Sequence, residues 1–315
     1  MSRRKRTVTG VYAPLEPSRV LTAVSPDGSR LHTEVHGPED GPSVVLAHGW
    51  TCSTAFWAPV ARRLVEDGHR VVLYDQRGHG RSPAPEACGY STYALADDLC
   101  AVLEATLEDG TPAVVGGHSM GAMTIMAAAG RPQLAQHGAA LMLCSTGARR
   151  LLGEARVLPF RGLAARTRAH RLLMGSRAPM GPVTALSRRA LHYGTMGPGA
   201  SPEQVEACAR IVHACPRPVR ASWGAVLGAL DLSAKLPGLT APTAVVAGTR
   251  DRLTPSLHAR ELAEALPHCT SLHELEGLGH MTPIEAPDRV ADVLRDLVED
   301  HVKRPGRLQT LRGRS

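Results

Sequence analysis

The sequence lacks the features that define several other classes of protein. No run approaches the length of about 18 uncharged apolar residues that a membrane-spanning helix requires. The basic segment Met1–Gly10 is not followed by the apolar stretch of a secretion signal. The seven cysteines form no C-x-x-C pair, which argues against a zinc cluster and against a disulfide framework. We therefore expect a soluble, cytoplasmic protein with reduced thiols and no stable membrane insertion.

Several residue types are scarce: asparagine is absent, lysine supplies only three of the 36 cations, and aromatic residues make up 3%. The formal charge of +7 comes from two basic tails and the arginine-rich stretch 149–200, while the rest of the chain is acidic. Runs of like charge are most often solvated, and the tails have no aromatic residue with which to recognise a nucleic acid. We expect no nucleic-acid partner. Whether the arginine-rich stretch binds an acidic substrate or an anionic membrane surface is left open.

What is present is a chain of 315 residues with enough apolar side chains, 43%, for a large core. Two runs that flank the turn sequence Ser-Pro-Asp-Gly predict an opening hairpin, Val20–Val24 and Arg30–Val35. Short apolar runs then predict buried parallel strands: Val44–Ala47, Val71–Tyr74, Ala113–Val115, Ala139–Leu143, Thr243–Ala247 and Cys269–Leu275. Apolar residues at three- and four-residue intervals predict helices between them: Trp57–Glu66, Tyr93–Leu107, Met120–Ala129, Leu257–Leu266 and Asp288–Val298. This alternation favours an α/β fold with a doubly wound, mostly parallel sheet.

One interval breaks the alternation. Between the predicted strands that end near Ser145 and begin near Thr243 lie about 90 residues, far more than the usual connection in such folds. Their helical character, clearest in Pro202–Ala214 and Val219–Leu230, predicts an inserted helical cap, or lid. The predicted division is a basic tail at 1–19, a core at 20–148 and 239–301, a cap at 149–238, and a second basic tail at 302–315.

A strand that runs into Gly117-His118-Ser119-Met120-Gly121 and then into an apolar helix is typical of a nucleophile elbow. In this turn the serine is pushed above the sheet, and small residues on both sides let the strand and the helix approach. The motif alone also fits an ordinary glycine-rich turn. Its place between a predicted strand and a predicted helix favours Ser119 as a nucleophile.

A serine nucleophile needs a histidine base and an acid to orient it, and these should follow at the ends of later strands. Asp251 comes just after Thr243–Ala247, and His280 comes after the last predicted strand. Three other histidines lie nearby. His258 falls in a predicted helix and His273 in a predicted strand, which favours ordinary surface or core roles; His268 is the remaining alternative.

The oxyanion hole requires backbone N–H groups that point at the developing negative charge. His48-Gly49-Trp50 follows the strand Val44–Ala47, and Met120 follows the nucleophile directly. The N–H groups of Trp50 and Met120 are therefore the predicted pair, although His-Gly alone is also an ordinary strand-ending turn.

Together these motifs resemble the α/β-hydrolase superfamily, over roughly Val20 to His301. The resemblance rests on His48-Gly49-Trp50, the loop Asp75–Ser82, the Ser119 elbow, Gly248–Pro255 and Gly279-His280. It implies a Ser119–His280–Asp251 triad with the oxyanion hole at Trp50 and Met120. In the family the Asp75–Ser82 segment is chiefly structural, so Asp75 is not predicted to be catalytic. A serine at the elbow departs from the relatives that resemble haloalkane dehalogenases and epoxide hydrolases, which argues against those activities.

The predicted function is cleavage of a carboxylic ester of a small or medium-sized molecule through an acyl-enzyme, without a metal or organic cofactor. Lactone or thioester cleavage and perhydrolase-type acyl transfer are alternatives at the same site, and a non-catalytic ligand-binding protein is an alternative of another class. Residues expected to line the substrate pocket are Cys52, His118 and Trp223. The sequence does not predict the acyl length, the leaving group or the oligomeric state.

Overall fold

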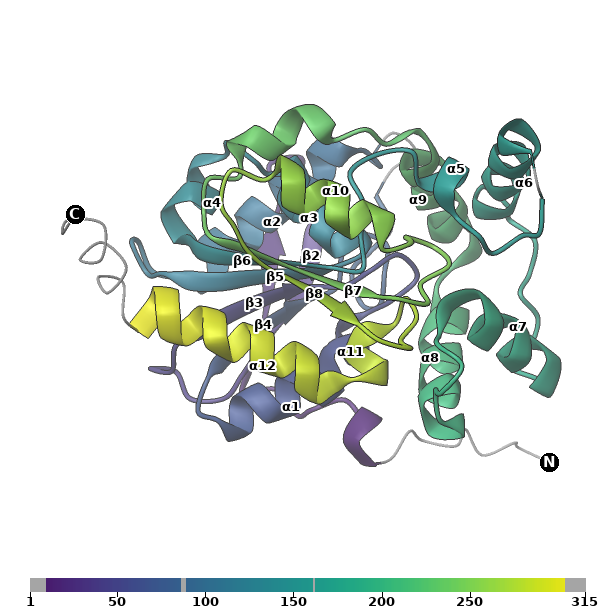
Figure 1. The fold of residues 1–315 in the computed structure, drawn as a ribbon. Helices are drawn as coiled ribbons and strands as arrows, with labels where there is room; N and C mark the ends of the chain where they lie inside the picture. The colour runs from purple at the N-terminus through teal and green to yellow at the C-terminus, as the bar shows by residue number, and fades with distance from the viewer. Residues whose placement is uncertain (1–9, 86–88, 161, 304–315) are drawn as a thin grey trace, which may run out of the picture.

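The computed structural model describes residues 10–85, 89–160 and 162–303. Its centre is an eight-stranded sheet in the order β1-β2-β4-β3-β5-β6-β7-β8 (Figure 1). The strands are β1 Arg19–Val24, β2 Arg30–His36, β3 Ser43–Ala47, β4 Arg70–Tyr74, β5 Ala113–His118, β6 Gly138–Cys144, β7 Thr243–Gly248 and β8 Cys269–Leu275. β2 pairs antiparallel with both of its neighbours, and every other pair in this sheet is parallel. The predicted α/β class with a mostly parallel sheet is confirmed.

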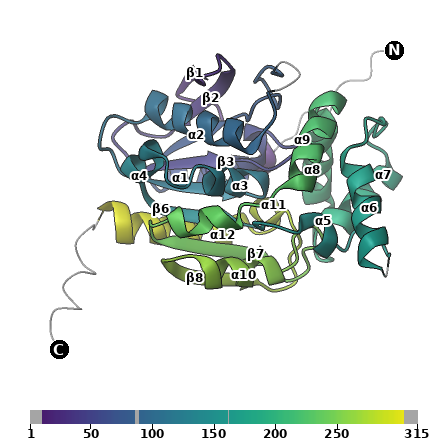
Figure 2. The same ribbon diagram turned by 90° about the horizontal axis from the view of Figure 1, so that it is seen from above.

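Helices cover both faces of the sheet (Figures 1 and 2). On one face α1 (Ala58–Glu66) packs against α12 (Pro287–Val298), with Leu64 and Leu294 in the buried cluster between helices and strands. On the other face lie α2 (Thr92–Thr106), α3 (Met120–Ala127), α4 (Pro132–His137) and α10 (Leu257–Ala265). Because both faces are covered, β3, β4, β5 and β7 are buried along their whole length, which is why they read as continuous apolar runs.

The interval between β6 and β7 contains five α-helices in the described residues, here called the cap helices. They are α5 Leu151–Glu154, α6 Leu163–Met174, α7 Ala185–Thr195, α8 Pro202–Ala214 and α9 Arg217–Ala229. They lie together beyond the carboxyl ends of the parallel strands, on the right in Figure 1. The side chains of Thr184 and Ser201 cap α7 and α8 by accepting the N–H of the third residue of each helix, which explains where these two helices begin.

Several short elements lie outside the predicted pattern. Besides α4 they are α11 (Thr282–Glu285) and the short helical turns Gly10–Tyr12, Thr54–Trp57, Ser233–Gly238 and Glu299–Lys303. Each is too short to show a helical period. The basic runs predicted at residues 3–6 and 304–314 lie outside the described residues. In the part of the chain that the structure describes, no helix is long and apolar enough to cross a membrane.

Candidate active site

The candidate site lies at the carboxyl ends of β3, β5, β7 and β8. β3 and β5 are neighbours in the sheet, but the chain leaves them in opposite directions, toward β4 and toward β6. Such a switch point opens a crevice between two diverging loops. One loop begins at His48 and the other contains Ser119, so the predicted oxyanion turn and the predicted nucleophile meet at this crevice.

Ser119 occupies the turn between β5 and α3 with φ 53° and ψ −115°. This left-handed region is unusual for a residue with a side chain and stores strain that the surroundings must support. The backbone N–H of Ser119 donates to the Cys144 carbonyl (2.8 Å), and the Thr146 hydroxyl donates to the Ser119 carbonyl (3.0 Å). The end of β6 therefore holds the strained turn in place.

The two glycines of the elbow are required by close contacts. A Cβ atom at Gly121 would lie 2.1 Å from the Ala47 carbonyl oxygen, and one at Gly117 would lie 2.4 Å from the Ala122 nitrogen. Real Cβ atoms do not approach backbone atoms this closely, so β5, α3 and the end of β3 can pack in this way only with glycine at both positions. The spacing of the two glycines, two residues before and two residues after Ser119, thus has a direct steric cause.

His280 and Asp251 form a buried pair, with 2.7 Å between Nδ1 and Oδ2. Because the carboxylate accepts at this distance, we assign the proton to Nδ1, which leaves Nε2 as the basic nitrogen. Asp251 Oδ1 also accepts the N–H groups of Leu253 (2.8 Å) and Thr254 (2.9 Å). The Thr254 hydroxyl donates to Oδ2 (2.8 Å) and lies 3.2 Å from Nδ1 of His280. Asp251 is thus fixed on both oxygens while it holds the imidazole.

The turn after β3 lies directly against the elbow. A Cβ atom at Gly49 would lie 2.7 Å from Nδ1 of His118 and 3.2 Å from Cβ of Ser119, so the turn can approach the elbow this closely only with glycine at this position. Thr51 has φ 64°, and its N–H donates to Nε2 of His79 (3.2 Å). Trp50, whose N–H is predicted to line the oxyanion hole, directly follows Gly49 in the chain. Met120, the first residue of α3, directly follows Ser119.

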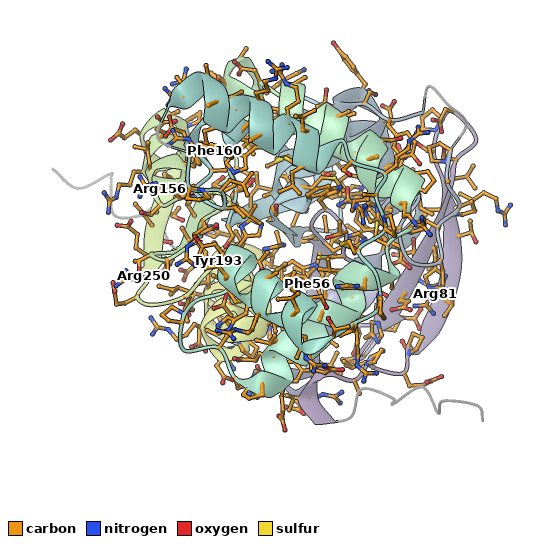
Figure 3. All side chains as sticks on the ribbon, turned by 90° about the vertical axis from the view of Figure 1, so that its right-hand side faces the viewer. Phe56, Arg81, Arg156, Phe160, Tyr193 and Arg250 are labelled. Carbon is orange, nitrogen blue, oxygen red and sulfur yellow. The ribbon has the colours of Figure 1, made fainter. Side chains whose placement is uncertain are left out.

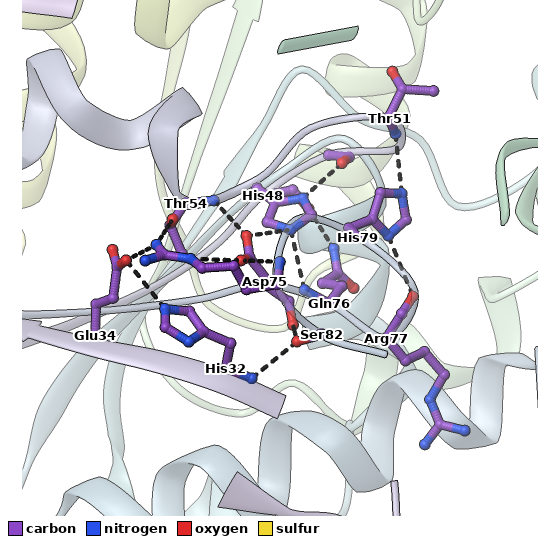
Figure 4. Close-up of polar contacts among 12 residues, drawn as sticks. His32, Glu34, His48, Thr51, Thr54, Asp75, Gln76, Arg77, His79 and Ser82 are labelled. Atoms are coloured by element: carbon purple, nitrogen blue, oxygen red, sulfur yellow. Dashed lines mark hydrogen bonds and ion pairs between the residues drawn. The ribbon is translucent and has the colours of Figure 1, made fainter. Parts of the chain in front are cut away.

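A buried polar network supports the turn from below (Figure 4). Nε2 of His48 accepts the N–H of Gln76 (3.0 Å), and its Nδ1 donates to the Gly49 carbonyl (2.8 Å). The Gln76 side chain donates to the His48 carbonyl, and its oxygen accepts from the Thr124 hydroxyl on α3 (3.0 Å). Burial and the neighbouring His79 lower the pKa of His48 to about 3, so it acts as a neutral link between the two loops.

Asp75 takes part in the same network rather than in the cavity (Figure 4). Its carboxylate accepts the N–H groups of Thr54 (2.8 Å) and Arg81 (2.9 Å). Burial raises the pKa of Asp75 and lowers that of His79 to about 4. These contacts fix the loop that follows β4 against the short helix that follows the oxyanion turn.

A cavity of about 410 Å³ opens above Ser119 and His280. Its core wall includes Trp50, Met123, Leu253, Thr254 and Met281. Its cap wall includes Leu151, Leu152, Val157, Leu173, Met174, Leu191 and Leu227. Figure 3 looks onto the cap helices from outside, with Phe160, Arg156 and Tyr193 on the left of the view. The lining is mainly apolar, as is usual for a small-molecule site.

Of the three predicted pocket residues, the cavity lining includes His118 but neither Cys52 nor Trp223. Trp223 is fully buried, and its indole N–H donates to the Arg77 carbonyl (3.1 Å). Cys52 turns into the core below the oxyanion turn, where burial raises the pKa of its thiol. The prediction was wrong for these two residues because nearness in sequence to the turn or the cap does not determine where a side chain points.

His118 packs against the catalytic histidine candidate. Its Nε2 donates to the His280 carbonyl (2.8 Å), and the two rings lie 4.9 Å apart. Burial and the neighbouring His280 hold the pKa of His118 well below its usual value, so the side chain is a neutral donor. Nδ1 of His118 has no hydrogen-bond partner among the described residues.

Two tryptophan side chains join the cap to the core, one donating a hydrogen bond from the core to the cap and the other from the cap to the core. The indole N–H of Trp50, in the core, donates to the Arg220 carbonyl of α9 (3.0 Å). The indole N–H of Trp223, in α9, donates to the Arg77 carbonyl of the core (3.1 Å). The Arg220 side chain in turn donates to the carbonyls of Ser176 (3.1 Å) and Ala178. The cap wall of the cavity is therefore tied to the oxyanion turn.

Sequence reasoning missed Thr254 and Gln76, which act through hydrogen bonds to residues that are distant in the chain. Both lie within segments that carry the sequence motifs, Asp75–Ser82 and Gly248–Pro255, but nothing in those segments assigns a role to either side chain. The described residues hold no group of three or more histidine, cysteine, aspartate or glutamate side chains placed to bind a metal ion. The described cysteines are free and, except for the half-buried Cys269, buried.

Comparisons with known proteins agree with this geometry. A sequence model of the alpha/beta hydrolase family matches residues 44–293. RutD of Variovorax paradoxus (strain S110), provisionally named a carbamate hydrolase, is 34% identical over 255 residues, which cover 79% of this chain and 89% of that protein. An esterase from Thermogutta terrifontis, solved with malate bound, has a TM-score of 0.71 and 25% identity, over 90% of this chain and 100% of that one.

The enol-lactonase from Burkholderia xenovorans LB400 also has the same fold. Its TM-score is 0.65 with 26% identity, and the match covers 89% of this chain and 100% of that one. The matched family model spans most of the chain, and the switch-point crevice, the elbow and the strand-end loops all fall within it. This protein belongs to the alpha/beta hydrolase family and is an enzyme of the hydrolase type.

Proposed function

We propose that the protein is a serine hydrolase that cleaves carboxylic esters through an acyl-enzyme, with Ser119 as nucleophile, His280 as base and Asp251 as the orienting acid. The observation that carries the proposal is that His280, paired with Asp251 at 2.7 Å, lines the same cavity as the strained Ser119 elbow. An elbow serine and an acid-oriented histidine are the parts that acyl transfer requires. The alternative of a non-catalytic binding protein is not pursued, because the protein belongs to the alpha/beta hydrolase family and is an enzyme of the hydrolase type.

In the first step Oγ of Ser119 attacks the ester carbonyl carbon, and Nε2 of His280 takes the hydroxyl proton. The tetrahedral intermediate collapses when the alcohol leaves with the proton that His280 returns. A water molecule then attacks the acyl-enzyme and gives one proton to His280; when this second intermediate collapses, His280 returns the proton to Oγ of Ser119 and the carboxylic acid is released. Asp251 keeps the Nδ1 proton in place and stabilises the imidazolium in both steps.

The N–H groups of Trp50 and Met120 stabilise the oxyanion in this proposal. Support comes from Gly49, which lets the turn after β3 approach Ser119 closely, and from the first turn of α3, which begins at Met120. The network of His48, Gln76 and Thr124 holds the two donor-bearing loops at a fixed distance, and a preorganised hole is what such stabilisation requires.

The substrate we propose is a small or medium-sized ester with an apolar acyl or alcohol part. A cavity of about 410 Å³ with aliphatic walls exceeds what carbamate itself would fill, so we favour esters over the substrate in the name of the relative RutD. Lactones remain the second candidate, since the enol-lactonase of Burkholderia xenovorans has the same fold at 26% identity. The cap helices act as the lid in this proposal, because they supply about half of the cavity wall.

The experiment that tests the nucleophile needs no knowledge of the substrate. Intact mass is measured after exposure to a fluorophosphonate, for the wild type, for Ser119→Ala and for the control Ser233→Ala, whose side chain does not line the cavity. We expect a single adduct on the wild type and on Ser233→Ala, and none on Ser119→Ala. A folded wild type without an adduct, or an adduct that persists in Ser119→Ala, would contradict the proposal.

The substrate class is then tested with a matched panel. Nitrophenyl esters of increasing acyl length, a lactone and the corresponding nitrophenyl carbamate are compared by kcat/KM. We expect esters of intermediate length to be hydrolysed fastest, because their apolar part fills the cap side of the cavity. A carbamate hydrolysed faster than every ester would contradict our choice of substrate but leave the nucleophile intact.

A further inference from the structure

The loop that carries His280 is held by the cap as well as by the core. The backbone N–H groups of His280 (2.7 Å) and Met281 (3.2 Å) both donate to the carbonyl of Thr195, the last residue of α7. Thr195 also lines the cavity, together with Leu191 and Gly194 of the same helix. The helix that a bound substrate would touch is therefore one hydrogen bond away from the backbone of the proposed base.

A single carboxylate joins the two segments at the same place. Oε2 of Glu285, on α11, accepts the N–H groups of Gly197 (2.7 Å) and Gly279 (3.0 Å), and Oε1 accepts that of Met281 (3.1 Å). Gly279 and Met281 flank His280 in the chain, while Gly197 follows the end of α7. The side chain therefore fixes the histidine loop on both sides of His280 and ties it to the cap.

The two segments touch without spare room. A Cβ atom at Gly197 would lie 2.1 Å from the Gly277 carbonyl oxygen, and one at Gly279 would lie 2.3 Å from the carbonyl carbon of Met196. The Gln204 side chain on α8 adds two further links, donating to the carbonyls of Ile284 and Glu285 (3.0 Å each). A shift of α7 or α8 must therefore move the histidine loop, because close packing transmits displacement.

The placement of the carboxylate is costly, which argues that it has a role. Burial raises the pKa of Glu285, and the nearby Asp251 acts in the same direction. Its hydrogen bonds in the described residues are to backbone N–H groups rather than to a cation. A neutral side chain of similar size could fill the space, but it could not accept from all of these donors at once.

We propose, resting on the serine-hydrolase function proposed above, that Glu285 is a positioning residue for His280. It sets the position of the imidazole relative to Ser119 and couples that position to helix α7 of the cap. Occupation of the cavity beside Leu191 and Thr195 then acts on the chemical step and not only on binding.

Two variants break the connection from opposite sides. Glu285→Gln replaces one accepting oxygen with an NH₂ group that faces backbone donors, and Gly197→Ala forces the cap segment away from the Gly277 carbonyl. The matched controls are Glu274→Gln, whose carboxylate pairs with the exposed Arg260, and Gly199→Ala, which has open space around it.

The readout is the division of the effect between kcat and KM for a nitrophenyl ester. Rates are normalised to the Ser119 sites titrated by exhaustive fluorophosphonate labelling, so that a misfolded fraction is not counted. We expect kcat to fall about 10- to 100-fold in each variant, with KM changed less than about twofold, because a misplaced base affects the transition state and leaves the cavity in place. Both controls should keep wild-type kcat.

The double variant tests whether the two residues act through one connection. If they do, Glu285→Gln combined with Gly197→Ala lowers kcat little more than the worse single variant, whereas independent effects would multiply. Single variants that retain kcat within about twofold, or that change only KM, overturn the inference, as does a fully multiplicative double variant. A wild type that neither labels nor hydrolyses any ester overturns the proposed function instead, and this inference with it.

Discussion

The two walls of the cavity differ in construction. All eight residues of α3, behind the nucleophile, are buried, whereas among the twelve residues of α6 in the cap only His170 is buried. The core wall consists of strand-end loops joined by buried neutral histidines, whereas the helices that form the cap wall leave large apolar side chains exposed on their outer side, such as Leu172 (69%) and Leu186 (78%). Elements with few buried contacts open at low free energy. The comparison indicates that the core fixes the proposed reacting groups and that α6 is the loosely packed part of the cap, whereas the end of α7 and helix α8 are tied to the loop that carries His280.

The largest effect is expected in the core wall, at the proposed triad. Asp251→Asn keeps the size of the side chain but removes its charge and stops it fixing the Nδ1 proton of His280. We expect kcat for an ester to fall about 10⁴-fold with little change in the melting temperature. Steady-state kinetics normalised to labelled Ser119 measure this, and a loss smaller than tenfold would mean that Asp251 is not the orienting acid.

A pair of glycine substitutions compares the packing of the two walls. Gly121→Ala places a Cβ atom 2.1 Å from the Ala47 carbonyl, while Gly162→Ala, before α6 in the cap, meets open space. We expect the core variant to lose about 1–3 kcal/mol or more of unfolding free energy. The cap variant should stay within about 0.5 kcal/mol of the wild type in urea unfolding. Equal losses in the two variants would remove the contrast between the walls.

The buried histidines make the core wall sensitive to acid. The pKa of His48 is lowered to about 3 and that of His79 to about 4, while the unfolded chain binds both protons near pH 6.5. Between these values the unfolded state holds more protons, so the unfolding free energy is complete above about pH 6.5 and falls as the pH is lowered. Each histidine should contribute a slope of up to about 1.4 kcal/mol per pH unit.

Urea unfolding between pH 7 and pH 5 measures this slope, above the range in which most carboxylates titrate. His48→Gln should reduce the slope of unfolding free energy against pH by the contribution of one histidine, up to about 1.4 kcal/mol per pH unit. An unfolding free energy that is constant across this range would show that His48 and His79 are not held neutral by the fold.

The smallest effect is expected on the outer surface of the cap. Leu186→Ser on α7 removes an apolar side chain that is 78% exposed, so the unfolding free energy should change by less than about 0.5 kcal/mol. Leu99→Ala on α2, at 0% exposure, is the matched core change and should cost about 2–5 kcal/mol. If both leucines prove equally costly in thermal unfolding, the outer surface of the cap is covered in solution.

Much of the core wall could be predicted because its residues stand in local patterns. Ser119 is identified by two glycines whose spacing has a steric cause, and Asp251 and His280 follow strands that show themselves as apolar runs. The alternation predicts parallel strands, whose carboxyl ends share one edge of the sheet, but the order of the strands at the switch point comes from the structure alone.

The remainder could not be predicted because it depends on contacts across the chain. Glu285 and Gln76 act on residues whose loops meet only in the folded protein, and no local period distinguishes them from surface glutamate or glutamine. Cys52 and Trp223 were misplaced for the related reason that a residue next to a site can point away from it. The predicted triad, oxyanion hole and cap boundaries stay predictions until the labelling and kinetic experiments are done.

The indole hydrogen bonds of Trp50 and Trp223 both cross the contact between α9 and the core, so tryptophan fluorescence can report on this contact. The chain has three tryptophans, and the third, Trp57, is fully buried in the core. Separation of α9 from the core would expose the indoles of Trp50 and Trp223 to water, while Trp57 would stay buried. If the cap helices act as the proposed lid, tryptophan emission should shift to longer wavelength when they separate from the core and shift back when a ligand binds, without any added dye.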